Sequence, residues 1–515
     1  MTDVVRRSTV ADVLHRSARR VPTRTALVFA DRTWTYAELD DAVSRAAAHL
    51  LGLGLGKGER VAAFGKNSDA YLVGFLACCR AGLVHVPMNN QFTSREAGYV
   101  LRQSGASAAL VDPGMRATLE GAEGCPDLVL SLRDEAGSLL DLARGAGVDS
   151  GVNAGDDAGV PDVHVDLDDT DLAQLLYTSG TTSAPKGAMM SHRALVHEYV
   201  SCVVALDMTE HDAPLHVMPL YHSAQMHVFL LPWLAVGATN TLLETPDPTE
   251  ILRRLEADRH GAFFAAPTLW VALANHADFE TRDLSALRKA YYGAAIMPGP
   301  VLTRLQEKLP ELGFYNCFGQ SEIAPLATVL RPEEHADRPS SIGRPVLFVD
   351  LRVVDAEEAD IAPGERGEIV YRSPQLCDGY WDKPEETETA FRGGWFHSGD
   401  LATVDEEGYL TIVDRVRDVI NTGGVLVAPR EIEDVLYAHP TVAEVAVVGV
   451  PDEKWGEAVQ AFVVPRAGAE IDVEALRAHA RADLASFKIP KDIRVVDALP
   501  RNASGKILKR ELRNA

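Results

Sequence analysis

Residues 172–192, LAQLLYTSGTTSAPKGAMMSH, join an apolar run to a loop rich in hydroxyl side chains. The apolar run, 172–177, predicts a buried strand. Glycine and small hydroxyl residues follow it and leave backbone N–H groups able to surround an anion, to which a lysine adds a point charge. The stretch therefore predicts a polyphosphate-binding loop with the candidate residues Thr178, Ser179, Gly180, Thr181, Thr182 and Lys186.

This loop differs from the P-loop of kinases and ATPases. The P-loop motif needs glycine directly before its lysine and Ser or Thr directly after it. Lys186 instead lies between Pro185 and Gly187. The sequence therefore argues against a P-loop enzyme.

The length and composition describe a globular chain with more than one domain. At 515 residues it is too long for one compact core. It has no run of about 18 apolar residues, so we expect no membrane span. The N-terminus carries acidic residues and no apolar segment, which argues against a secretory or transit peptide. Six cysteines without a CxxC pair or a Cys/His ligand pattern predict free thiols in a reducing, cytoplasmic setting.

The net charge constrains the ligands. A formal charge of −24 without a long basic run argues against a nucleic-acid partner. Polyanionic ligands such as ATP or coenzyme A would need the scarce cations to be concentrated locally. The cations of interest are Lys186, Arg415, Lys488, Lys491 and Lys506.

The first three hundred or so residues alternate between predicted strands and helices. Thr35 and Glu38 form a capping-box pattern that opens a helix through Leu50. A second helix is predicted at 71–80, and apolar runs predict strands at 61–64, 84–86, 108–111, 261–265 and 289–292. This alternation is typical of a parallel α/β sheet. Residues 134–171 are rich in Asp, Gly and Ala, and we expect most of this stretch to be a surface excursion that leads to the strand at Leu172.

The last third of the chain has a different pattern of predicted elements. Short strands predicted at 346–354, 367–371 and 409–413 indicate a β-rich subdomain. A smaller α+β unit follows, with strands near 445–450 and 461–464, a helix from 473 to about 484, and a basic tail. We predict two domains, 1–414 and 415–515.

Several segments resemble, in order, the motifs of the adenylate-forming superfamily, which comprises acyl- and aryl-CoA ligases, peptide-synthetase adenylation domains and firefly-type luciferases. The hydroxyl-rich loop is similar to the phosphate-binding signature, with Ser183 where glycine is usual. The resemblance covers essentially the whole chain. It implies a large N-terminal domain of two α/β subdomains plus a small β-barrel, followed by a mobile α+β C-terminal domain.

The resemblance assigns a nucleotide site to residues 315–322, YNCFGQSE. It implies that Phe318, where Tyr is usual, stacks on adenine and that Glu322 holds Mg²⁺. One carboxylate is enough, since Mg²⁺ takes one or two carboxylates together with phosphate oxygens. Gly293 resembles the start of a turn that brings backbone against adenine and the acyl group. The implied ATP-binding residues also include Ala294, Ala295, Asn316, Gly319, Gln320 and Ser321.

Other segments resemble the ribose and acid sites. The motif 395–400, WFHSGD, implies that Asp400 accepts hydrogen bonds from the ribose, and Arg415 matches a second ribose contact. Residues 219–222, PLYH, resemble the segment that lines the carboxylate pocket and gates the thiol tunnel. Gln225 and His227 predict a pocket less apolar than one for a plain alkyl chain. The candidate pocket residues are Met218, His222, Gly293, Ala294 and Cys317.

The C-terminal segments carry the remaining roles. Residues 500–506, PRNASGK, resemble the loop with the catalytic lysine, here Lys506. Arg417 occupies the hinge position, where Asp or Lys is common. Segments that meet coenzyme A in the family match Gly423, Gly424, Phe487 and Lys491.

Together these motifs predict an acid–CoA ligase that depends on ATP and Mg²⁺. A carboxylate and ATP would give an acyl-adenylate and pyrophosphate, and the thiol of coenzyme A would then displace AMP. Charge neutralisation by Lys506, Lys186 and Mg²⁺, held by Glu322, would be the main contribution of the protein.

Three alternatives stay open. They are a stand-alone adenylating enzyme that passes its adenylate to a carrier protein, a luciferase-like oxygenase, and a non-catalytic nucleotide sensor. An amino-acid substrate would usually call for an Asp in the pocket segment, and 219–228 has none. The sequence does not name the acid, and it leaves a homodimer open.

Overall fold

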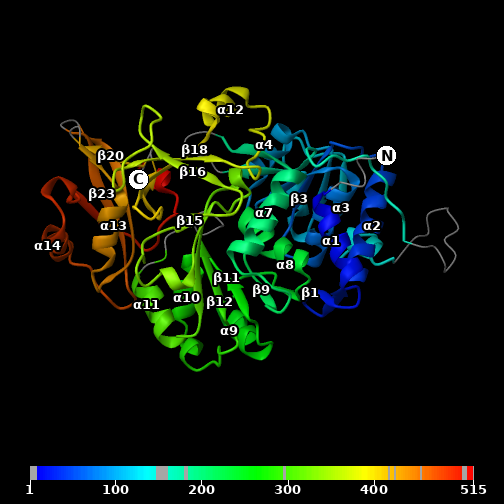
Figure 1. The fold of residues 1–515 in the computed structure, drawn as a ribbon, viewed down its shortest axis with the longest axis horizontal. Helices are drawn as coiled ribbons and strands as arrows, with labels where there is room; N and C mark the ends of the chain where they lie inside the picture. Colours follow the sequence, from blue (N-terminus) through cyan, green and yellow to red (C-terminus); the bar gives the residue numbers. More distant parts are fainter. Residues whose placement is uncertain are drawn as a thin grey trace. The chain divides into compact units, whose positions relative to one another are not determined.

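The computed structural model describes residues 8–145, 160–178, 184–293, 297, 299–415, 418–422, 425–452, 455–501 and 507–513, and the chain divides into two compact units (Figure 1). Unit 1 comprises Met1–Pro339, Gly343–Asp350 and Arg372–Gly394. Unit 2 comprises Ser340–Ile342, Leu351–Tyr371 and Trp395–Ala515. The mixed α/β fold with a large N-terminal and a smaller C-terminal part is as expected. The boundary at 414/415 lies inside unit 2 and stays a prediction.

The first sheet of unit 1 has six strands in the order β6-β5-β3-β4-β7-β8. Alternate residues of β3 enter two different cores: Val61 and Ala63 pack with one set of helices, Ala62 and Phe64 with another. The strands are β3 (Arg60–Phe64), β4 (Val84–Met88), β5 (Ala108–Val111), β6 (Leu128–Ser131), β7 (Leu172–Thr178) and β8 (Lys186–Ser191). One face carries α2 (Tyr36–Gly52), α3 (Asp69–Ala81) and α6 (Leu139–Ala143), the other α4 (Ser94–Ser104) and α5 (Arg116–Glu120).

The second sheet of unit 1 has nine strands in the order β15-β14-β13-β12-β11-β9-β10-β1-β2. They are β1 (Thr25–Phe29), β2 (Arg32–Thr35), β9 (Pro214–His216), β10 (Asn240–Leu242), β11 (Ala262–Phe264), β12 (Lys289–Gly293), β13 (Gly313–Phe318), β14 (Thr328–Leu330) and β15 (Arg344–Pro345). Helices α9 (Pro248–Ala257), α10 (Pro267–Ala274) and α11 (Gly299–Lys308) lie against β11 and β12 (Figure 1). Helices α1 (Val10–Arg20), α7 (His192–Ala205) and α8 (Leu231–Val236) share the core of α2 and α3.

Most predicted elements of unit 1 are confirmed. The capping box at the start of α2 is formed, with Glu38 accepting from the Thr35 backbone N at 2.8 Å. The prediction of a parallel sheet holds for the central strands and is wrong at the edges, where β2, β8, β14 and β15 run antiparallel to their neighbours. Strand β8 follows β7 too closely for the crossover of a dozen or more residues that a parallel pair requires. Within residues 134–171, α6 buries Leu139, Leu140 and Ala143, so this part of the stretch belongs to the core.

Unit 2 begins with a four-stranded sheet, β16-β17-β18-β19, rather than the expected barrel. The strands are β16 (Asp350–Val354), β17 (Gly367–Arg372), β18 (Phe396–Val404) and β19 (Leu410–Arg415). The described residues of this part form an open sheet and not the closed small barrel that the resemblance implied. The strand predicted from residue 346 begins only at 350, and β18 was not predicted.

The remainder of unit 2 confirms the predicted α+β organisation. Its strands are β20 (Ile420–Thr422), β21 (Val425–Val427), β22 (Val442–Asp452), β23 (Gly456–Pro465) and β24 (Asp492–Val495). Val445 and Val447 face α13 (Pro429–Tyr437) and α14 (Val473–Asp483), while Ala446 and Val448 pack with Leu512 of α15 (Lys509–Arg513). This two-sided burial explains why the apolar runs of β22 and β23 were recognisable.

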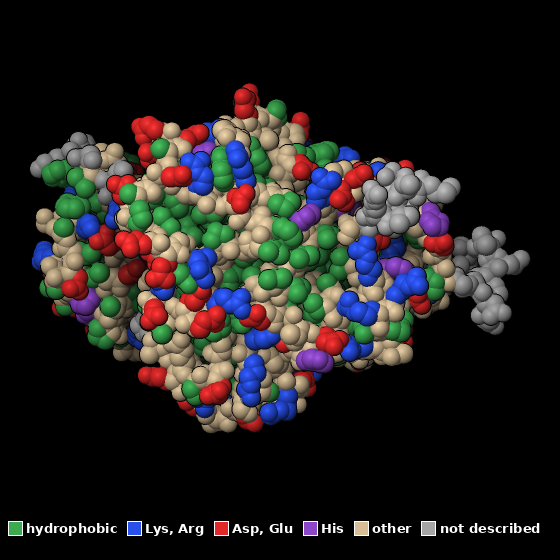
Figure 2. Space-filling view, viewed as in Figure 1, with side chains coloured by type: hydrophobic (Ala, Val, Ile, Leu, Met, Phe, Trp, Pro, Cys, Tyr) green, Lys and Arg blue, Asp and Glu red, His purple; other side chains and the backbone are tan. Residues whose placement is uncertain are grey.

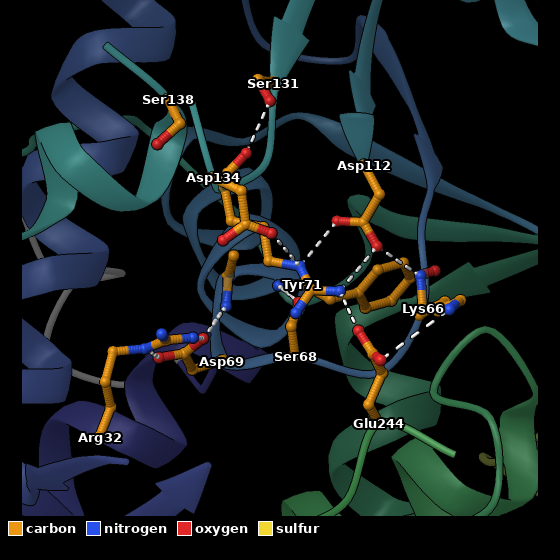
Figure 3. Close-up of polar contacts among 12 residues, drawn as sticks. Arg32, Lys66, Ser68, Asp69, Tyr71, Asp112, Ser131, Asp134, Ser138 and Glu244 are labelled. Carbon is orange, nitrogen blue, oxygen red and sulfur yellow. Dashed lines mark hydrogen bonds and ion pairs between the residues drawn. The ribbon is translucent and has the colours of Figure 1, made fainter. Parts of the chain in front are cut away.

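A network of ion pairs joins the carboxyl ends of strands from both sheets of unit 1 (Figure 3). Arg133 Nε donates to Asp112 Oδ1 at 3.1 Å, and Arg133 also pairs with Glu244. The Lys66 backbone N donates to Asp112 Oδ2 at 2.8 Å, and its Nζ lies 3.8 Å from Glu244 Oε2. The turn after β3, which contains Lys66 and Asn67, is therefore held to both sheets.

A chain of buried side chains crosses the core between α7 and β4. Tyr199 donates to His227 Nδ1 at 3.0 Å, His227 Nε2 donates to Gln174 Oε1 at 2.8 Å, and Gln174 Nε2 donates to His85 Nδ1 at 2.9 Å. Burial lowers the pKa of His227 and of His85 to about 3, from 6.5. Both rings are therefore neutral in the folded protein at neutral pH.

The neutral histidines predict a loss of stability in mild acid. Below pH 6.5 the unfolded chain binds protons at His227 and His85 that the folded chain does not take up until about pH 3, so acid favours unfolding. Between pH 6.5 and about 5.5 each histidine should reduce the free energy of unfolding by about 1 kcal/mol, measured by denaturant titration. His227→Gln should flatten this dependence, whereas changing the exposed His164 to Gln should not. An unchanged slope in His227→Gln would contradict the prediction.

Three further observations concern the surface, the helices and the cysteines. On the face drawn in Figure 2, the described Lys and Arg side chains lie among Asp and Glu side chains, so charge of both signs is spread over it. None of the helices in the described residues is long and apolar enough to cross a membrane. All six cysteines are free thiols, as predicted.

Candidate functional site

The carboxylate of Glu322 lies where three segments of unit 1 meet. Glu322 belongs to a short 3₁₀ turn, η5 (Ser321–Ile323), and is only 9% exposed. Thr178 Oγ1, at the end of β7, donates to its Oε1 at 3.3 Å, and the Tyr380 hydroxyl donates to the same oxygen at 3.1 Å. The Cys377 backbone N donates to the Glu322 carbonyl at 2.8 Å. The end of the strand that leads into the predicted phosphate loop is thus joined directly to the predicted metal ligand.

Lys186 contacts Tyr380, the residue that donates to the Glu322 carboxylate. It is the first residue of β8 and is paired with Thr178 in the β7–β8 ladder. Its Nζ lies 4.8 Å from the centre of the Tyr380 ring, a cation–π contact. The structure therefore brings Thr178, Lys186 and Glu322 together, with Tyr380 in contact with both Lys186 and Glu322.

The nucleotide motif occupies β13 and the turn after it. Asn316, Cys317 and Phe318 lie in β13, and Gly319 follows with φ of +156°. A Cβ at 319 would lie 1.9 Å from the Pro325 carbonyl oxygen, so only glycine fits there. Gln320 follows Gly319, and the Ser321 and Ser223 hydroxyls are hydrogen-bonded at 2.9 Å.

Gly293 and Cys317 are neighbours across two parallel strands. Gly293 ends β12 and is paired with Cys317 in β13. A Cβ at 293 would lie 2.2 Å from the Cys317 carbonyl oxygen, which requires glycine at this close approach. Two predicted pocket residues are therefore adjacent. Ala294 and Ala295 lie outside the described residues.

The predicted pocket segment after β9 is fixed by a buried asparagine. Asn67 Nδ2 donates to the Met218 carbonyl at 2.9 Å, and Asn67 Oδ1 accepts from the Leu220 backbone N at 2.8 Å. His222 is partly exposed, and its Nδ1 accepts from the Ala224 backbone N at 3.3 Å. Met218 packs against the core beneath the second sheet.

The structure does not support the polar pocket inferred from Gln225 and His227. Both are fully buried in the π-helical turn η3 (Ala224–Leu230). Gln225 accepts from the Met218 backbone N at 3.0 Å and contacts His216 at 2.9 Å, while His227 belongs to the chain through Gln174. Their polarity is used inside the core, so it indicates nothing about the acid.

Unit 2 contains the predicted ribose residues. Asp400 lies in β18, 3% exposed, and is paired in the ladder with Arg415 of β19. Arg415 Nε lies 2.8 Å from Asp400 Oδ1. The Ser398 hydroxyl accepts from the Asp400 backbone N at 3.1 Å. Asp400 is thus a strand residue with a fixed carboxylate and not a residue of an exposed turn.

The other predicted residues of unit 2 divide into two groups. Phe487, in η8 (Ser486–Lys488), is 45% exposed, and Lys491 Nζ lies 5.0 Å from the centre of the Trp455 ring and 3.3 Å from Asp452 Oδ2. The second group lies outside the described residues and consists of Arg417, Gly423, Gly424 and Lys506. In unit 1, the predicted residues that lie outside the described residues are Ser179, Gly180, Thr181 and Thr182.

Sequence reasoning missed Tyr380, Asn67 and Ser223. Tyr380 follows Gly379, whose φ is +123°, so a glycine directly before two aromatic residues was the only local signal. Asn67 follows strand β3 at the carboxyl edge of a parallel sheet, a position typical of site residues in α/β folds. Ser223 carried no recognisable signal.

The donor set around Glu322 fits Mg²⁺ but does not resemble a transition-metal site. Among the described residues no group of three His, Cys, Asp or Glu side chains could hold a metal ion. Mg²⁺ is satisfied by one or two carboxylates with substrate phosphate oxygens and water. Glu322, with hydroxyl donors on Oε1 and no hydrogen bond to Oε2 from the described residues, is suited to that role.

Comparisons with known proteins show to which family the chain is similar. Residues 14–381 match the AMP-binding enzyme family, and residues 431–506 match the AMP-binding enzyme C-terminal domain. A feruloyl-CoA synthase from Amycolatopsis sp is 40% identical over 97% of each chain. A medium/long-chain-fatty-acid–CoA ligase from Mycobacterium tuberculosis is 35% identical over 96% of this chain and 88% of its own.

Solved structures lead to the same conclusion. The crystal structure of ATP-bound MatB from Rhodopseudomonas palustris superposes with a TM-score of 0.88 at 32% identity, over 98% of each chain. Both parts of the family architecture are therefore present, in the expected order. The chain belongs to the AMP-binding enzyme family of adenylate-forming enzymes.

Proposed function

We propose that this acid–CoA ligase activates its acid at Glu322, Lys186 and Lys506 with the help of Mg²⁺. The ligase activity follows from the family and from full-length relatives that are CoA ligases. ATP and coenzyme A are its co-substrates. A carboxylate attacks the α-phosphorus of ATP to give an acyl-adenylate and pyrophosphate, and the thiol of coenzyme A then displaces AMP.

One observation carries the residue assignment. The hydrogen bond from Thr178 to Glu322 joins the strand before the phosphate loop to the nucleotide motif, although the two residues are 144 positions apart. Lys186, opposite Thr178 in the ladder, supplies positive charge at the same place. These contacts support a polyphosphate site bounded by Thr178, Lys186 and Glu322.

The chain's own residues would lower the barrier by charge placement. Adenylation brings a carboxylate against a polyphosphate, so fixed positive charge favours the transition state. Mg²⁺, when bound to Glu322 and phosphate oxygens, would neutralise part of the developing charge. Lys186 would hold the phosphates, and Lys506 would bridge the attacking carboxylate and the α-phosphate.

We further propose an aromatic acid of the phenylpropenoic type as the substrate. The support is the 40% identity to a feruloyl-CoA synthase, against 35% to a ligase named for fatty acids. Purified protein with ATP, Mg²⁺ and coenzyme A should release pyrophosphate fastest with ferulic or a related acid. Mass spectrometry should detect the matching CoA thioester. A preference for medium- or long-chain fatty acids would overturn this assignment, and no thioester with any acid would overturn the proposed mechanism.

Asp400→Ala should raise the KM for ATP by at least about tenfold. The ribose hydroxyls would lose their charged acceptor, and hydrogen bonds to charged groups contribute about 1.5–3 kcal/mol each. Asp400→Asn, which keeps the shape beside Arg415, should show a smaller rise. Asp360→Ala is the matched control, because Asp360 also pairs with an arginine in unit 2 but is exposed. An ATP dependence equal to that of the control would remove Asp400 from the nucleotide site.

A further inference from the structure

We propose that Tyr380 is a positioning residue that holds the carboxylate of Glu322 for the metal and the ammonium of Lys186 for the phosphates. This inference rests on the proposed function, because it assigns Glu322 and Lys186 to one polyphosphate site. It adds a residue that lies outside the motifs that predicted the site. The hydroxyl and the ring of Tyr380 have separate tasks, which makes the two separable by substitution.

The hydroxyl of Tyr380 fixes the orientation of the carboxylate. It donates to Glu322 Oε1 at 3.1 Å, and Thr178 donates to the same oxygen at 3.3 Å. Two donors on Oε1 orient the plane of the carboxylate and leave Oε2 without a hydrogen bond from the described residues. Hydrogen bonds to a ligating carboxylate set its orientation, and their loss typically weakens metal binding 10- to 100-fold.

The ring of Tyr380 has the second task. Lys186 Nζ lies 4.8 Å from its centre, within the range of an attractive cation–π contact. A lysine side chain has many rotamers, and the aromatic face restricts them. The ring thereby holds the ammonium beside Tyr380, while the backbone of Lys186 is paired with Thr178 in the β7–β8 ladder.

The backbone around Tyr380 makes the arrangement stiff. Tyr380 forms a β-bridge with Ala188 of β8, the Met189 backbone N donates to the Gly379 carbonyl at 2.9 Å, and the Trp381 backbone N donates to the Gly187 carbonyl at 2.8 Å. Cys377, three residues before Tyr380, donates its backbone N–H to the Glu322 carbonyl. Residues 377–381 are thus attached both to β8, which carries Lys186, and to the turn that carries Glu322.

The decisive measurement is metal binding without turnover. Mn²⁺ is used as a paramagnetic substitute for Mg²⁺, and its binding to the full-length protein with ATP, without acid or coenzyme A, is followed by electron paramagnetic resonance. Tyr380→Phe keeps the ring and loses the hydroxyl, so the Mn²⁺ concentration for half-saturation should rise about tenfold. Binding of metal-free ATP, measured by calorimetry, should change less than about twofold because the ring on Lys186 is retained.

Two further variants separate the two tasks. Tyr380→Leu, without hydroxyl or ring, should weaken both Mn²⁺ binding and metal-free ATP binding. Tyr71→Phe is the matched control, since Tyr71 is a buried tyrosine of unit 1 whose hydroxyl has no hydrogen-bond partner among the described residues. This control should behave as the unmodified protein in both titrations. Thermal melting without ligands checks that each variant is folded.

A double variant tests whether Tyr380 acts through Glu322. In a Glu322→Gln background, Tyr380→Phe should cause no further loss of Mn²⁺ binding. The inference would be overturned if Tyr380→Phe weakened Mn²⁺ binding as much in the Glu322→Gln background as in the unmodified protein. It would also be overturned if Tyr380→Phe alone bound Mn²⁺ as tightly as Tyr71→Phe does. These readouts need no acid, so they judge Tyr380 even if no acid yields a thioester. The absence of a thioester with every acid would instead contradict the proposed function.

Discussion

Lys506→Ala should abolish ATP-dependent adenylate formation while sparing thioester formation from a finished adenylate. Lys506 is proposed to bridge the attacking carboxylate and the α-phosphate while negative charge accumulates there. This contact exists in the first transition state and not in the attack of a thiol on the acyl-adenylate. An interaction made in one transition state lowers only that rate constant. The loss should be on the order of 10²-fold or more, as for removal of one preorganised donor.

The experiment for Lys506 follows the two half-reactions separately. Pyrophosphate release reports the first, and synthetic acyl-adenylate with coenzyme A reports the second. Arg510→Ala is the control, because Arg510 is an exposed cation in the same tail. Equal losses in both half-reactions would remove Lys506 from its proposed role. Unimpaired adenylation would contradict the assignment of residues 500–506 as the catalytic loop.

The apolar runs of the sequence predicted the positions of strands better than their directions. Strands β3 and β5 are buried on both faces, so their runs are continuous and their limits were nearly correct. Direction depends on the partner strand, and the sequence does not display the partner. Strand β18 was missed because its residues alternate between buried and partly exposed, so Phe396 to Val404 never forms an apolar run.

The ordered motifs named residues that lie together in the structure, but they did not predict the contacts between them. Thr178, Lys186 and Glu322 were named from two motifs, and the structure brings them together. Tyr380 was missed because it reaches Glu322 from 58 positions away, in a segment with no motif of its own. Only the pairing of residues 377–381 with β8 brings it there.

Polar residues near a pocket segment are ambiguous in a sequence. Gln225 and His227 carry the same hydrogen-bonding groups whether they face a substrate or the core. The structure shows both with core partners: Met218 and His216 for Gln225, and Gln174 and Tyr199 for His227. The choice depends on which face of the π-helical turn points inward, and no short pattern in the sequence determines that.

Glu322→Gln should reduce adenylate formation roughly 10²-fold at limiting Mg²⁺ without unfolding the protein. The amide has nearly the volume of the carboxylate, and its oxygen can still accept from Thr178 and Tyr380. The fold around η5 should therefore persist, and thermal melting should change little. Only the charge that attracts the metal is removed.

The dependence on Mg²⁺ distinguishes Glu322 from Lys506. Excess Mg²⁺ should partly restore adenylation in Glu322→Gln, because the metal can still bind through the phosphates of ATP, but it should not restore Lys506→Ala. Thioester formation from synthetic adenylate should be nearly normal in both variants, since pyrophosphate has already left. Glu333→Gln, an exposed carboxylate eleven positions away, is the control. If Glu322→Gln turned over as fast as this control at limiting Mg²⁺, the metal would have to be held elsewhere, and Tyr380 would then have no metal ligand to position.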